Sequence, residues 1–523
     1  MKQNNKAVLG LLLLLVFACI FYCLNAYKET FGERDSYRMI LGMNDLIVFD
    51  KPLGSKRLYG SDISFAYYAL VDFFRPIFKK NLLLIVPYMN QINAAFGILM
   101  VIPFFLLVKR YWGVGIALFA NILLILLPVW RTTAQYAHPM VGAVVFMFIG
   151  LALISYRSSL SSLRLGANKL ILILWDVLIV TALALCLMFR LDAILMFPLI
   201  PACLILEGYP LKKIVFPSVL YSFLAIIIFK VMQSQLPYIH IQKNGGIFEQ
   251  LFLWNNPVRY VDYFLRGNLL FVWGLNPLFL LIFLISCIYL WRQRSYQNLF
   301  FILPVVLINY IFWLPNPAPA RHFIYLSPVV AISIAIFFAD ILPQAKSFVE
   351  NNKKIGVAIA ASFIFSIVIS NHYSYSAPLS KKYSYAVTDV GTKLQQLEPK
   401  DKPIFVIGDT IPAAAQMQLM SAQTKVKAEQ SNVLTDDSVV AQKKSALKPK
   451  LEYVPLLSVD NGKNKFVLYS QGWKSRTNEI KRFFSETNKY DQFYIVVNML
   501  DRSGKKIDFD TSSLPKKLEV LKL

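Results

Sequence analysis

The stretch AVLGLLLLLVFACIFYCL, residues 7–24, decides the class of fold. It contains no charged residue, and its length is close to the ~20 apolar residues that a helix needs to cross the hydrocarbon core of a bilayer. It is longer than the apolar part of a usual signal peptide, and it lacks a small-x-small cleavage site. We therefore interpret it as an uncleaved first membrane span.

Further apolar runs follow as far as residue 371, among them 170–189, 192–207 and 355–371, and with the first they predict about eleven membrane spans. Hydrophobic residues make up 56% of the 523 positions and charged residues only 16%, which excludes an ordinary soluble globular protein. All five cysteines fall inside apolar runs, so neither a disulfide framework nor a C-x-x-C metal site is predicted. The predicted fold class is an α-helical polytopic membrane protein.

Lysine and arginine are concentrated in alternate loops between the predicted spans. Cytoplasmic loops of membrane proteins carry an excess of these residues, so the pattern predicts a cytoplasmic N-terminus and, with an odd number of spans, an outer C-terminus. The basic loops include residues 109–110, 157–169, 212–213 and 292–294, whereas the alternate short loops hold little more than Arg131, Arg190 and Arg321. The long segments of the chain then lie outside, where we expect its function.

The sequence divides into two predicted domains. Residues 1–371 form a transmembrane domain with a long first outer loop at 27–87, and residues 372–523 form a polar, lysine-rich tail. The tail contains three apolar runs typical of strands, which are PIFVIG (403–408), KFVLYSQ (465–471) and FYIVVN (493–498). Helical patterns separate these runs, so the tail is predicted to be an extracytoplasmic α/β domain with a parallel or mixed sheet.

The segment FGERDSYR, residues 31–38, follows the first span on the predicted outer side. Glu33 and Asp35 are two residues apart, with Arg34 and Arg38 beside them. A carboxylate among cations stays ionised and can accept a proton from a hydroxyl, which makes either one a candidate general base. The alternative is a solvated charge cluster at the membrane surface that has no chemical role.

The first outer loop also contains DISFAYYALVDFFRPIFKK, residues 62–80, in which apolar and aromatic residues are mixed with charged ones. This composition predicts a helix in the membrane interface with its polar side toward water. Such a helix would help to roof a cavity at the outer leaflet, with Arg75 available to a lipid phosphate. The predicted span interiors are almost free of charged residues, whereas a transporter needs ionisable groups along its path, so a transport function is disfavoured.

Three more segments stand at the beginnings of predicted spans: YAHPMVGAVVFMFIGLAL (136–153), FRLDAILMFPLIPACL (189–204) and PAPARHFIYLSPVVAISIA (317–335). Together with the short cytoplasmic N-terminus, the acidic motif after the first span and the polar outer tail, they resemble integral-membrane glycosyltransferases of the GT-C superfamily. The resemblance is particularly to bacterial relatives of protein O-mannosyltransferases and of the lipid A aminoarabinose transferase, and it covers essentially the whole membrane part. It implies a protein of the bacterial inner (plasma) membrane.

The resemblance implies transfer of a sugar from a polyprenyl-phosphate donor to a hydroxyl of a protein, lipid or glycan acceptor outside the cytoplasm, with inversion at the anomeric carbon. In such enzymes a carboxylate of the first outer loop acts as the base. Many of them have an adjacent Asp-Glu pair there, whereas this sequence has Glu33-Arg34-Asp35. Asp35 is favoured because the Ser-Tyr-Arg after it resembles the residues that commonly come after the family acid, and Glu33 is the second candidate.

A lipid phosphate is already a good leaving group, so the enzyme must mainly activate the acceptor and neutralise developing charge. Arginine suits the second task because it can grip phosphate through two donors. The candidate substrate- and phosphate-binding residues are Arg38, Arg75, Arg131, His138, Arg190, Arg321 and His322. Each arginine could equally be an interface anchor, and Asp192 could form a structural ion pair with Arg190. A divalent metal occurs in the wider superfamily, but no DxD or His–carboxylate metal site is evident in the sequence.

Other functions fit parts of the sequence. A lipid-linked glycan flippase would share the basic outer rim, and an O-antigen ligase or polymerase would share the donor and a similar number of spans. A membrane-anchored assembly protein would use its tail to bind partners, but it leaves the elaborate first loop unexplained. The expected partners are the polyprenyl-linked sugar, its acceptor and the lipid bilayer, and no nucleic-acid partner is expected.

Overall fold

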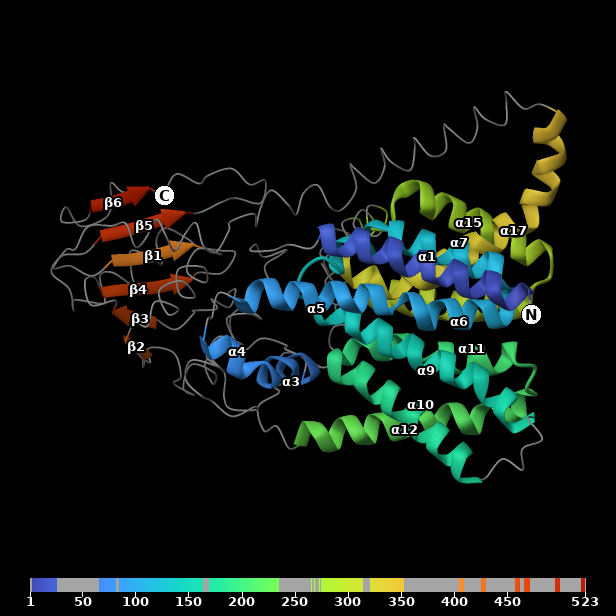
Figure 1. The fold of residues 1–523 in the computed structure, drawn as a ribbon, viewed down its shortest axis with the longest axis horizontal. Coiled ribbons are helices and arrows are strands. Elements are labelled where there is room, and N and C mark those ends of the chain that lie inside the picture. The colour runs from blue at the N-terminus through green and yellow to red at the C-terminus, as the bar shows by residue number, and fades with distance from the viewer. Residues whose placement is uncertain are drawn as a thin grey trace. The chain divides into compact units, whose positions relative to one another are not determined.

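The computed structural model (Figure 1) describes residues 2–25, 65–80, 84–162, 169–234, 274–313 and 320–351, together with residues 265, 268 and 272 and six strands between 404 and 522. The chain divides into two compact units. The first contains Met1–Ala26, Asp62–Tyr67 and Asn90–Pro378, and the second contains Tyr27–Ser61, Tyr68–Met89 and Leu379–Leu523. The predicted domain boundary at residue 371 lies outside the described residues.

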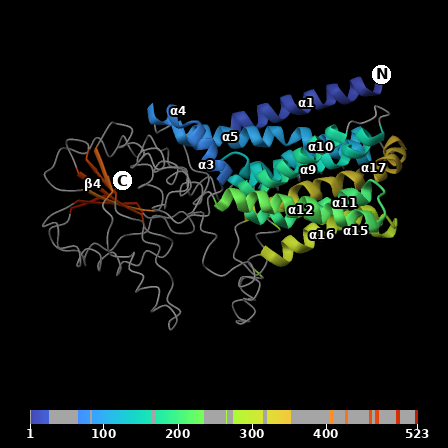
Figure 2. The same ribbon diagram turned by 90° about the horizontal axis from the view of Figure 1, so that it is seen from below.

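Helices make up the described part of the first unit and lie side by side as a bundle (Figures 1 and 2). Two short 3-10 helices, η2 (Leu191–Met196) and η4 (Ala320–Leu326), precede two of the α-helices. The α-helices are α1 (Lys2–Asn25), α5 (Ile85–Leu99), α6 (Val101–Trp112), α7 (Val114–Leu126), α8 (Pro128–Thr133), α9 (Pro139–Ser162), α10 (Lys169–Phe189), α11 (Leu199–Leu206), α12 (Leu211–Ser234), α15 (Pro277–Arg292), α16 (Tyr296–Trp313) and α17 (Ser327–Asn351).

Local sequence explains several of the helix boundaries. Gly113 has φ of +90° between α6 and α7, a conformation that a residue with a side chain rarely adopts. Asn276 caps α15 by accepting a hydrogen bond from the Leu278 N–H at 2.9 Å. The predicted interfacial helix over 62–80 is helical as α3 (Phe65–Phe73) and α4 (Arg75–Lys80), whereas its location in the membrane interface stays a prediction.

Five helices of the described part are long and apolar enough to cross a membrane: Ile85–Trp112, Pro139–Ser159, Leu170–Phe189, Lys212–Met232 and Arg321–Ile341. Shorter apolar helices cover Ala7–Tyr22, Val114–Leu126, Leu191–Leu206, Pro277–Arg292 and Tyr296–Phe312. The chain is therefore an integral membrane protein, as predicted, while the count of about eleven spans stays a prediction. The run 355–371 lies outside the described residues.

One predicted span differs from its expected form. The run 192–207 begins as the 3-10 helix η2, and regular α-helix covers only α11, Leu199–Leu206. Pro198 stands at the junction, where a residue without a backbone N–H cannot continue the helical hydrogen bonds of the preceding turn.

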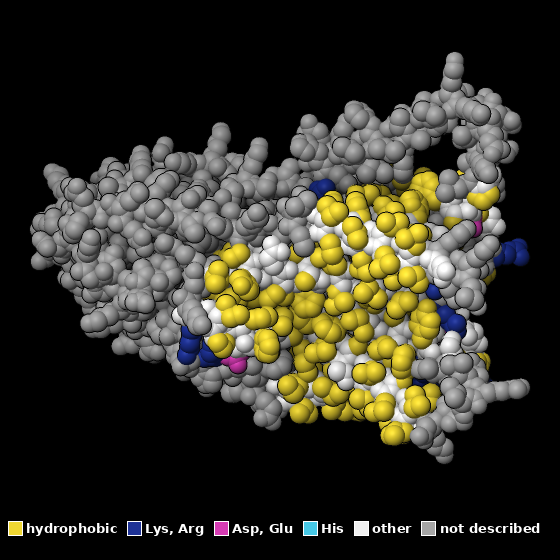
Figure 3. Space-filling model, viewed as in Figure 1, with side chains coloured by type: hydrophobic (Ala, Val, Ile, Leu, Met, Phe, Trp, Pro, Cys, Tyr) yellow, Lys and Arg dark blue, Asp and Glu magenta, His cyan; other side chains and the backbone are white. Residues whose placement is uncertain are grey.

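Hydrophobic side chains cover the face of the bundle that is seen in Figure 3, with lysine and arginine at its margins. α9 is mostly buried among other helices, whereas α12 is mostly exposed. Large apolar residues of α12, including Val215, Phe216 and Val219, lie on the surface. A contiguous apolar surface of this kind is suited to contact with lipid acyl chains.

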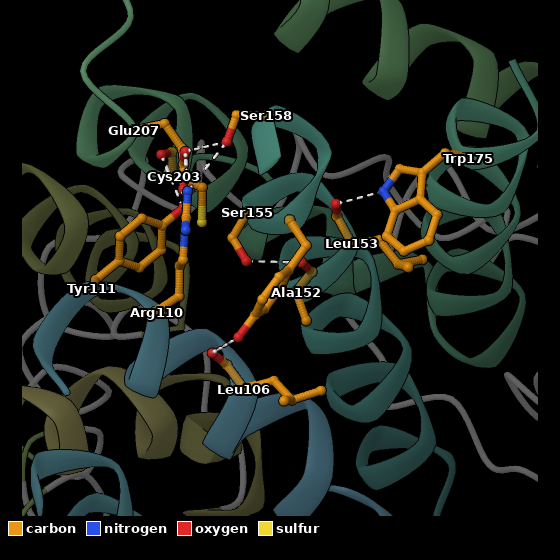
Figure 4. A network of polar contacts seen from close by, with 11 residues as sticks. Leu106, Arg110, Tyr111, Ala152, Leu153, Ser155, Ser158, Trp175, Cys203 and Glu207 are labelled. Carbon is orange, nitrogen blue, oxygen red and sulfur yellow. Dashed lines mark hydrogen bonds and ion pairs between the residues drawn. The ribbon is translucent and has the colours of Figure 1, made fainter. Parts of the chain in front are cut away.

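A polar network connects the ends of three helices that are far apart in the sequence (Figure 4). Arg110 of α6 donates through Nε and Nη2 to the two carboxylate oxygens of Glu207, each at 3.2 Å. Ser158 of α9 donates to the same carboxylate at 2.6 Å. Glu207, which directly follows α11, is nearly buried, so these contacts hold α6, α9 and α11 together at this end of the bundle.

Gly142 allows α9 to approach the last residue of α10 closely. A Cβ atom at position 142 would lie 2.6 Å from the Phe189 ring, a distance that real side chains do not tolerate. Phe189 also stacks on Phe146 of α9, with ring centroids 5.4 Å apart. This packing fixes the point at which α10 ends and the polar turn of Arg190 and Asp192 begins.

The second unit contains a six-stranded mixed sheet of order β2-β3-β4-β1-β5-β6. Its strands are β1 (Ile404–Gly408), β2 (Lys425–Ala428), β3 (Leu457–Asp460), β4 (Lys465–Ser470), β5 (Tyr494–Asn498) and β6 (Glu519–Lys522). β4, β1, β5 and β6 are parallel, and β2 and β3 join them in antiparallel pairs. β1, β4 and β5 coincide with the three predicted apolar runs. The α/β assignment of the tail stays a prediction because the segments between the strands lie outside the described residues.

Candidate functional site

Several segments that are distant in the sequence meet at one end of the bundle. α10 ends here and contacts η2, and η2 in turn contacts η4. η4 also packs against α8 and α9. Each of these turns carries polar residues next to an apolar helix. Their side chains include His138, Arg190, Asp192, Arg321, His322 and Tyr325, which we call the arginine–histidine cluster.

Asp192 is the centre of this cluster. Arg190 donates to its carboxylate through both Nη2, at 2.7 Å from Oδ2, and Nε, at 3.1 Å from Oδ1. The Tyr325 hydroxyl donates to Oδ1 at 2.6 Å, and His322 Nδ1 lies 3.9 Å from Oδ2. Three donors use most of the accepting capacity of the carboxylate, so Asp192 is suited to fixing its neighbours and poorly suited to accepting a proton from a substrate.

Burial and charge define the chemistry of the cluster. Only 7% of the surface of Arg321 and 1% of that of His138 is exposed to solvent. Burial, together with the guanidinium groups of Arg321 and Arg190, holds the pKa of His138 well below its ordinary value of 6.5. At neutral pH the ring is therefore uncharged.

His138 has a defined tautomer in this arrangement. The backbone N–H of Met140 donates to its Nδ1 at 3.3 Å. A nitrogen that accepts a hydrogen bond carries no proton, so the proton of the neutral ring is on Nε2. His138 thus provides a neutral N–H donor.

Two asparagines of α5 hold the turn that leads into His138. Asn93 donates from Nδ2 to the carbonyl oxygens of Thr133 and Tyr136, at 2.7 and 2.6 Å. Asn90 accepts from the Ala137 N–H at 2.8 Å. Both asparagines are fully buried. Because these backbone groups are paired inside the protein, the turn has a fixed path.

Tyr67 of α3 connects to the same turn. Its hydroxyl donates to Asn93 Oδ1 at 3.3 Å and interacts with the His138 backbone. Its ring packs edge-on against Phe189, the residue before Arg190. One buried tyrosine therefore contacts the supports of both His138 and Arg190.

The arrangement is suited to binding an anion. The six residues of the cluster contain two arginines and one aspartate, so with neutral histidines their formal charge is 2 − 1 = +1. Arginine binds phosphate in a bidentate manner, and a buried cation interacts more strongly with an anion than an exposed one does. The cluster can therefore neutralise charge on a phosphate ester.

The structure brings together four of the predicted site residues: His138, Arg190, Arg321 and His322. The predicted pairing of Asp192 with Arg190 is confirmed. Arg131 lies on α8 and interacts electrostatically with the Tyr22 hydroxyl. Arg75 forms an ion pair with Asp72, three residues earlier, through Nε at 2.7 Å from Oδ1. Glu33, Asp35 and Arg38 lie outside the described residues.

Several parts of the site escaped prediction from the sequence. Tyr325 follows Arg321 by four residues, and this spacing alone did not indicate a contact with Asp192. Asn90 and Asn93 lie in an apolar helix and act on backbone atoms of a distant turn, so no local motif could reveal them. No group of three histidine, cysteine or acidic side chains in the described part of the chain could hold a metal ion.

No family model matches the chain, and no curated protein matches it. Among solved structures, it is similar to the archaeal oligosaccharyltransferase AglB from Archaeoglobus fulgidus in complex with an inhibitory peptide and a dolichol-phosphate, at 13% identity and a TM-score of 0.47. That match covers 79% of this chain and 64% of the archaeal one, so this chain spans less than two thirds of its length. It is also similar to ArnT from Cupriavidus metallidurans bound to undecaprenyl phosphate, at 12% identity and a TM-score of 0.47, over 88% of this chain and 98% of that one.

Proposed function

We propose that the protein is an integral-membrane glycosyltransferase that moves a sugar from a polyprenyl-phosphate donor to an acceptor hydroxyl on the extracytoplasmic side, with inversion. The arginine–histidine cluster carries this proposal. It is a buried site with net positive charge at one end of an apolar helix bundle. A lipid phosphate fits such a place because its polyprenyl chain can stay among acyl chains while the phosphate meets the helix ends.

In this proposal the cluster binds the leaving group. Arg190 and Arg321 neutralise the phosphate as negative charge develops on it. The Nε2–H of neutral His138 donates a hydrogen bond to a phosphate oxygen or a sugar hydroxyl without adding a second full charge. His322, beside Asp192, interacts with the same kinds of group, a phosphate oxygen or a sugar hydroxyl.

The first outer loop supplies the base. Asp35 takes the proton of the acceptor hydroxyl, and the hydroxyl oxygen attacks the anomeric carbon from the face opposite the phosphate. The bond between that carbon and the phosphate oxygen breaks, and its electron pair leaves with the polyprenyl phosphate. Glu33 is the alternative base. The proposal for these two residues is supported by the sequence alone.

A transfer assay tests the proposal. Purified protein in nanodiscs receives polyprenyl phosphates that carry labelled sugars, together with a membrane extract as acceptor, and the loss of donor is measured. Replacing the base is expected to lower the rate by about 100-fold or more in either Asp35→Asn or Glu33→Gln. Asp176→Asn is a matched control, because it removes an ion-paired carboxylate of α10 that lies outside the cluster.

Full activity of both acidic variants would show that the base lies elsewhere. If the wild type consumes no donor but moves it across sealed vesicles, the flippase is the correct function. A tag after Leu523 that is reached only from the cytoplasm would contradict the proposed side of the reaction.

A further inference from the structure

We infer that Asp192 is a positioning residue for the lipid phosphate: it fixes the direction of Arg190 and, through Tyr325, joins η2 to η4. This inference rests on the proposed function and concerns a residue that does not itself touch the phosphate. It accounts for an acidic side chain at the centre of a site that binds an anion. Charge alone would make such a residue unfavourable there.

The contacts of Arg190 provide the first step. Asp192 holds the guanidinium through Nε and one Nη2 hydrogen, which lie along one edge of the planar group. A guanidinium fixed along one edge has its other edge in a fixed direction, since the group is planar and rigid. Phe189 fixes the backbone just before Arg190 by stacking on α9. The side chain is thus held at both ends.

Tyr325 provides the second step. Its hydroxyl bonds to Asp192 at 2.6 Å and is fully buried with the rest of its side chain. Tyr325 belongs to η4, the same short helix that carries Arg321 and His322. One carboxylate therefore connects the turn of Arg190 to the turn of Arg321, so that the two guanidinium groups keep a constant separation.

The sign of one measurement separates positioning from charge. Asp192→Asn removes a negative charge near the phosphate, and by charge alone it would tighten phosphate binding. If Asp192 positions Arg190, the same substitution frees the guanidinium and weakens binding. Asp192→Glu keeps the charge but displaces it by one methylene, so the positioning role predicts weaker binding here too.

The experiment measures the dissociation constant of polyprenyl phosphate for the full chain in nanodiscs of neutral phosphatidylcholine. We expect Asp192→Asn to raise it about tenfold, as for loss of one charge-assisted hydrogen bond. In an Arg190→Gln background, the same substitution should have a clearly smaller effect, because the part that passes through Arg190 is already lost and only the part that passes through Tyr325 and η4 remains. Tyr325→Phe should raise it by a smaller factor, and only while Asp192 is present.

Asp176→Asn is the matched control. Asp176 also pairs with an arginine, Arg157, and accepts from a tyrosine, Tyr221, but it lies within α10, whereas Asp192 lies on η2 beyond the end of that helix. Its variant should bind polyprenyl phosphate as the wild type does. Thermal unfolding of each variant identifies any that fail to fold. If the Asp192→Asn variant does not fold, the Asp192→Glu variant is used in the binding measurement instead.

The outcomes are distinguishable. Equal or tighter binding by Asp192→Asn would refute positioning while leaving the glycosyltransferase proposal in place. An undiminished effect of Asp192→Asn in the Arg190→Gln background would assign Asp192 a general structural role and overturn the inference as well. A wild-type protein that binds no polyprenyl phosphate would end both the proposed function and the inference.

Discussion

Two triads of the helix bundle share one pattern and differ in their surroundings. In the 192 triad, Arg190 and Tyr325 bond to Asp192, and in the 176 triad, Arg157 and Tyr221 bond to Asp176. Both arginines are bidentate, with closest contacts of 2.7 and 2.6 Å. Asp176 lies on α10, about 20 Å from the end of that helix at residue 189 at 1.5 Å per residue, whereas Asp192 lies beyond that end, on η2.

The surroundings decide what each triad can do. The side chains of Arg157 and Asp176 are 35% and 32% exposed, whereas those of Arg190 and Asp192 are 20% and 12% exposed. Arg321 and two buried histidines adjoin only the 192 triad among the described contacts. The charges of the 176 triad balance within the triad, while the 192 triad belongs to a cluster of net charge +1. An ion pair of the same geometry therefore holds helices together in the 176 triad, whereas in the 192 triad it forms part of an anion-binding site.

The largest expected difference between the triads is in catalysis. Arg321→Gln removes the cation beside the 192 triad and should lower kcat/KM for sugar transfer by about 100-fold, as for loss of a donor to a developing anion. Arg157→Gln in the 176 triad should leave transfer within about twofold. Steady-state assays with varied donor measure both. Equal losses in the two variants would remove the distinction between the triads.

Packing gives the next largest difference. Gly142→Ala should move the Phe189 ring, and with it Arg190, because the new methyl group would lie 2.6 Å from ring atoms. We expect a loss of stability of about 1–3 kcal/mol and a weaker binding of polyprenyl phosphate. Gly150→Ala is the control on the same helix, since its methyl group meets the flexible end of Leu183 at 3.0 Å. Thermal unfolding and binding should separate the two variants.

The 176 triad is expected to contribute to stability alone. Asp176→Asn removes a carboxylate that connects α9, α10 and α12 through Arg157 and Tyr221. Because the pair is about one-third exposed, the loss should be about 1 kcal/mol. Chemical unfolding in detergent measures it. A large loss of transfer at unchanged stability would instead place the 176 triad in the active site.

The free energy of unfolding should depend on pH near neutrality through the histidines beside the 192 triad, because the 176 triad contains no histidine. The pKa of His138 is lower in the folded protein than its ordinary 6.5, so the folded state binds fewer protons just below that pH. The contribution of His138 to the free energy of unfolding is then fully present above pH 6.5. Below that pH the contribution falls by about 1 kcal/mol for each pH unit. His138→Asn should flatten this slope when unfolding is measured between pH 7.5 and 5.5. An unchanged slope would assign the dependence to other groups.

Much of the membrane architecture could be predicted from hydrophobic run length, because the bilayer fixes how long an apolar helix must be. The candidate arginines and histidines were found because polar residues between apolar helices stand out, as Arg190 and Arg321 do. The break at Pro198 was missed, since apolar residues continue through it and run length does not report helix geometry. Contacts between turns that are 133 residues apart, such as Tyr325 to Asp192, depend on how helices pack and have no local signal.

The turn before His138 has a further consequence for how this protein can diverge. The hydrogen bonds that join Asn90 and Asn93 to this turn are made to backbone atoms of Thr133, Tyr136 and Ala137. Substitutions of Thr133, Tyr136 or Ala137 therefore preserve the hydrogen bonds to Asn90 and Asn93, provided that the new side chains fit. Homologous proteins could therefore differ in the residues of this turn and still keep its backbone path. A sequence search based on the turn residues would miss such homologues, whereas a search for two asparagines about one helical turn apart in α5 would find them.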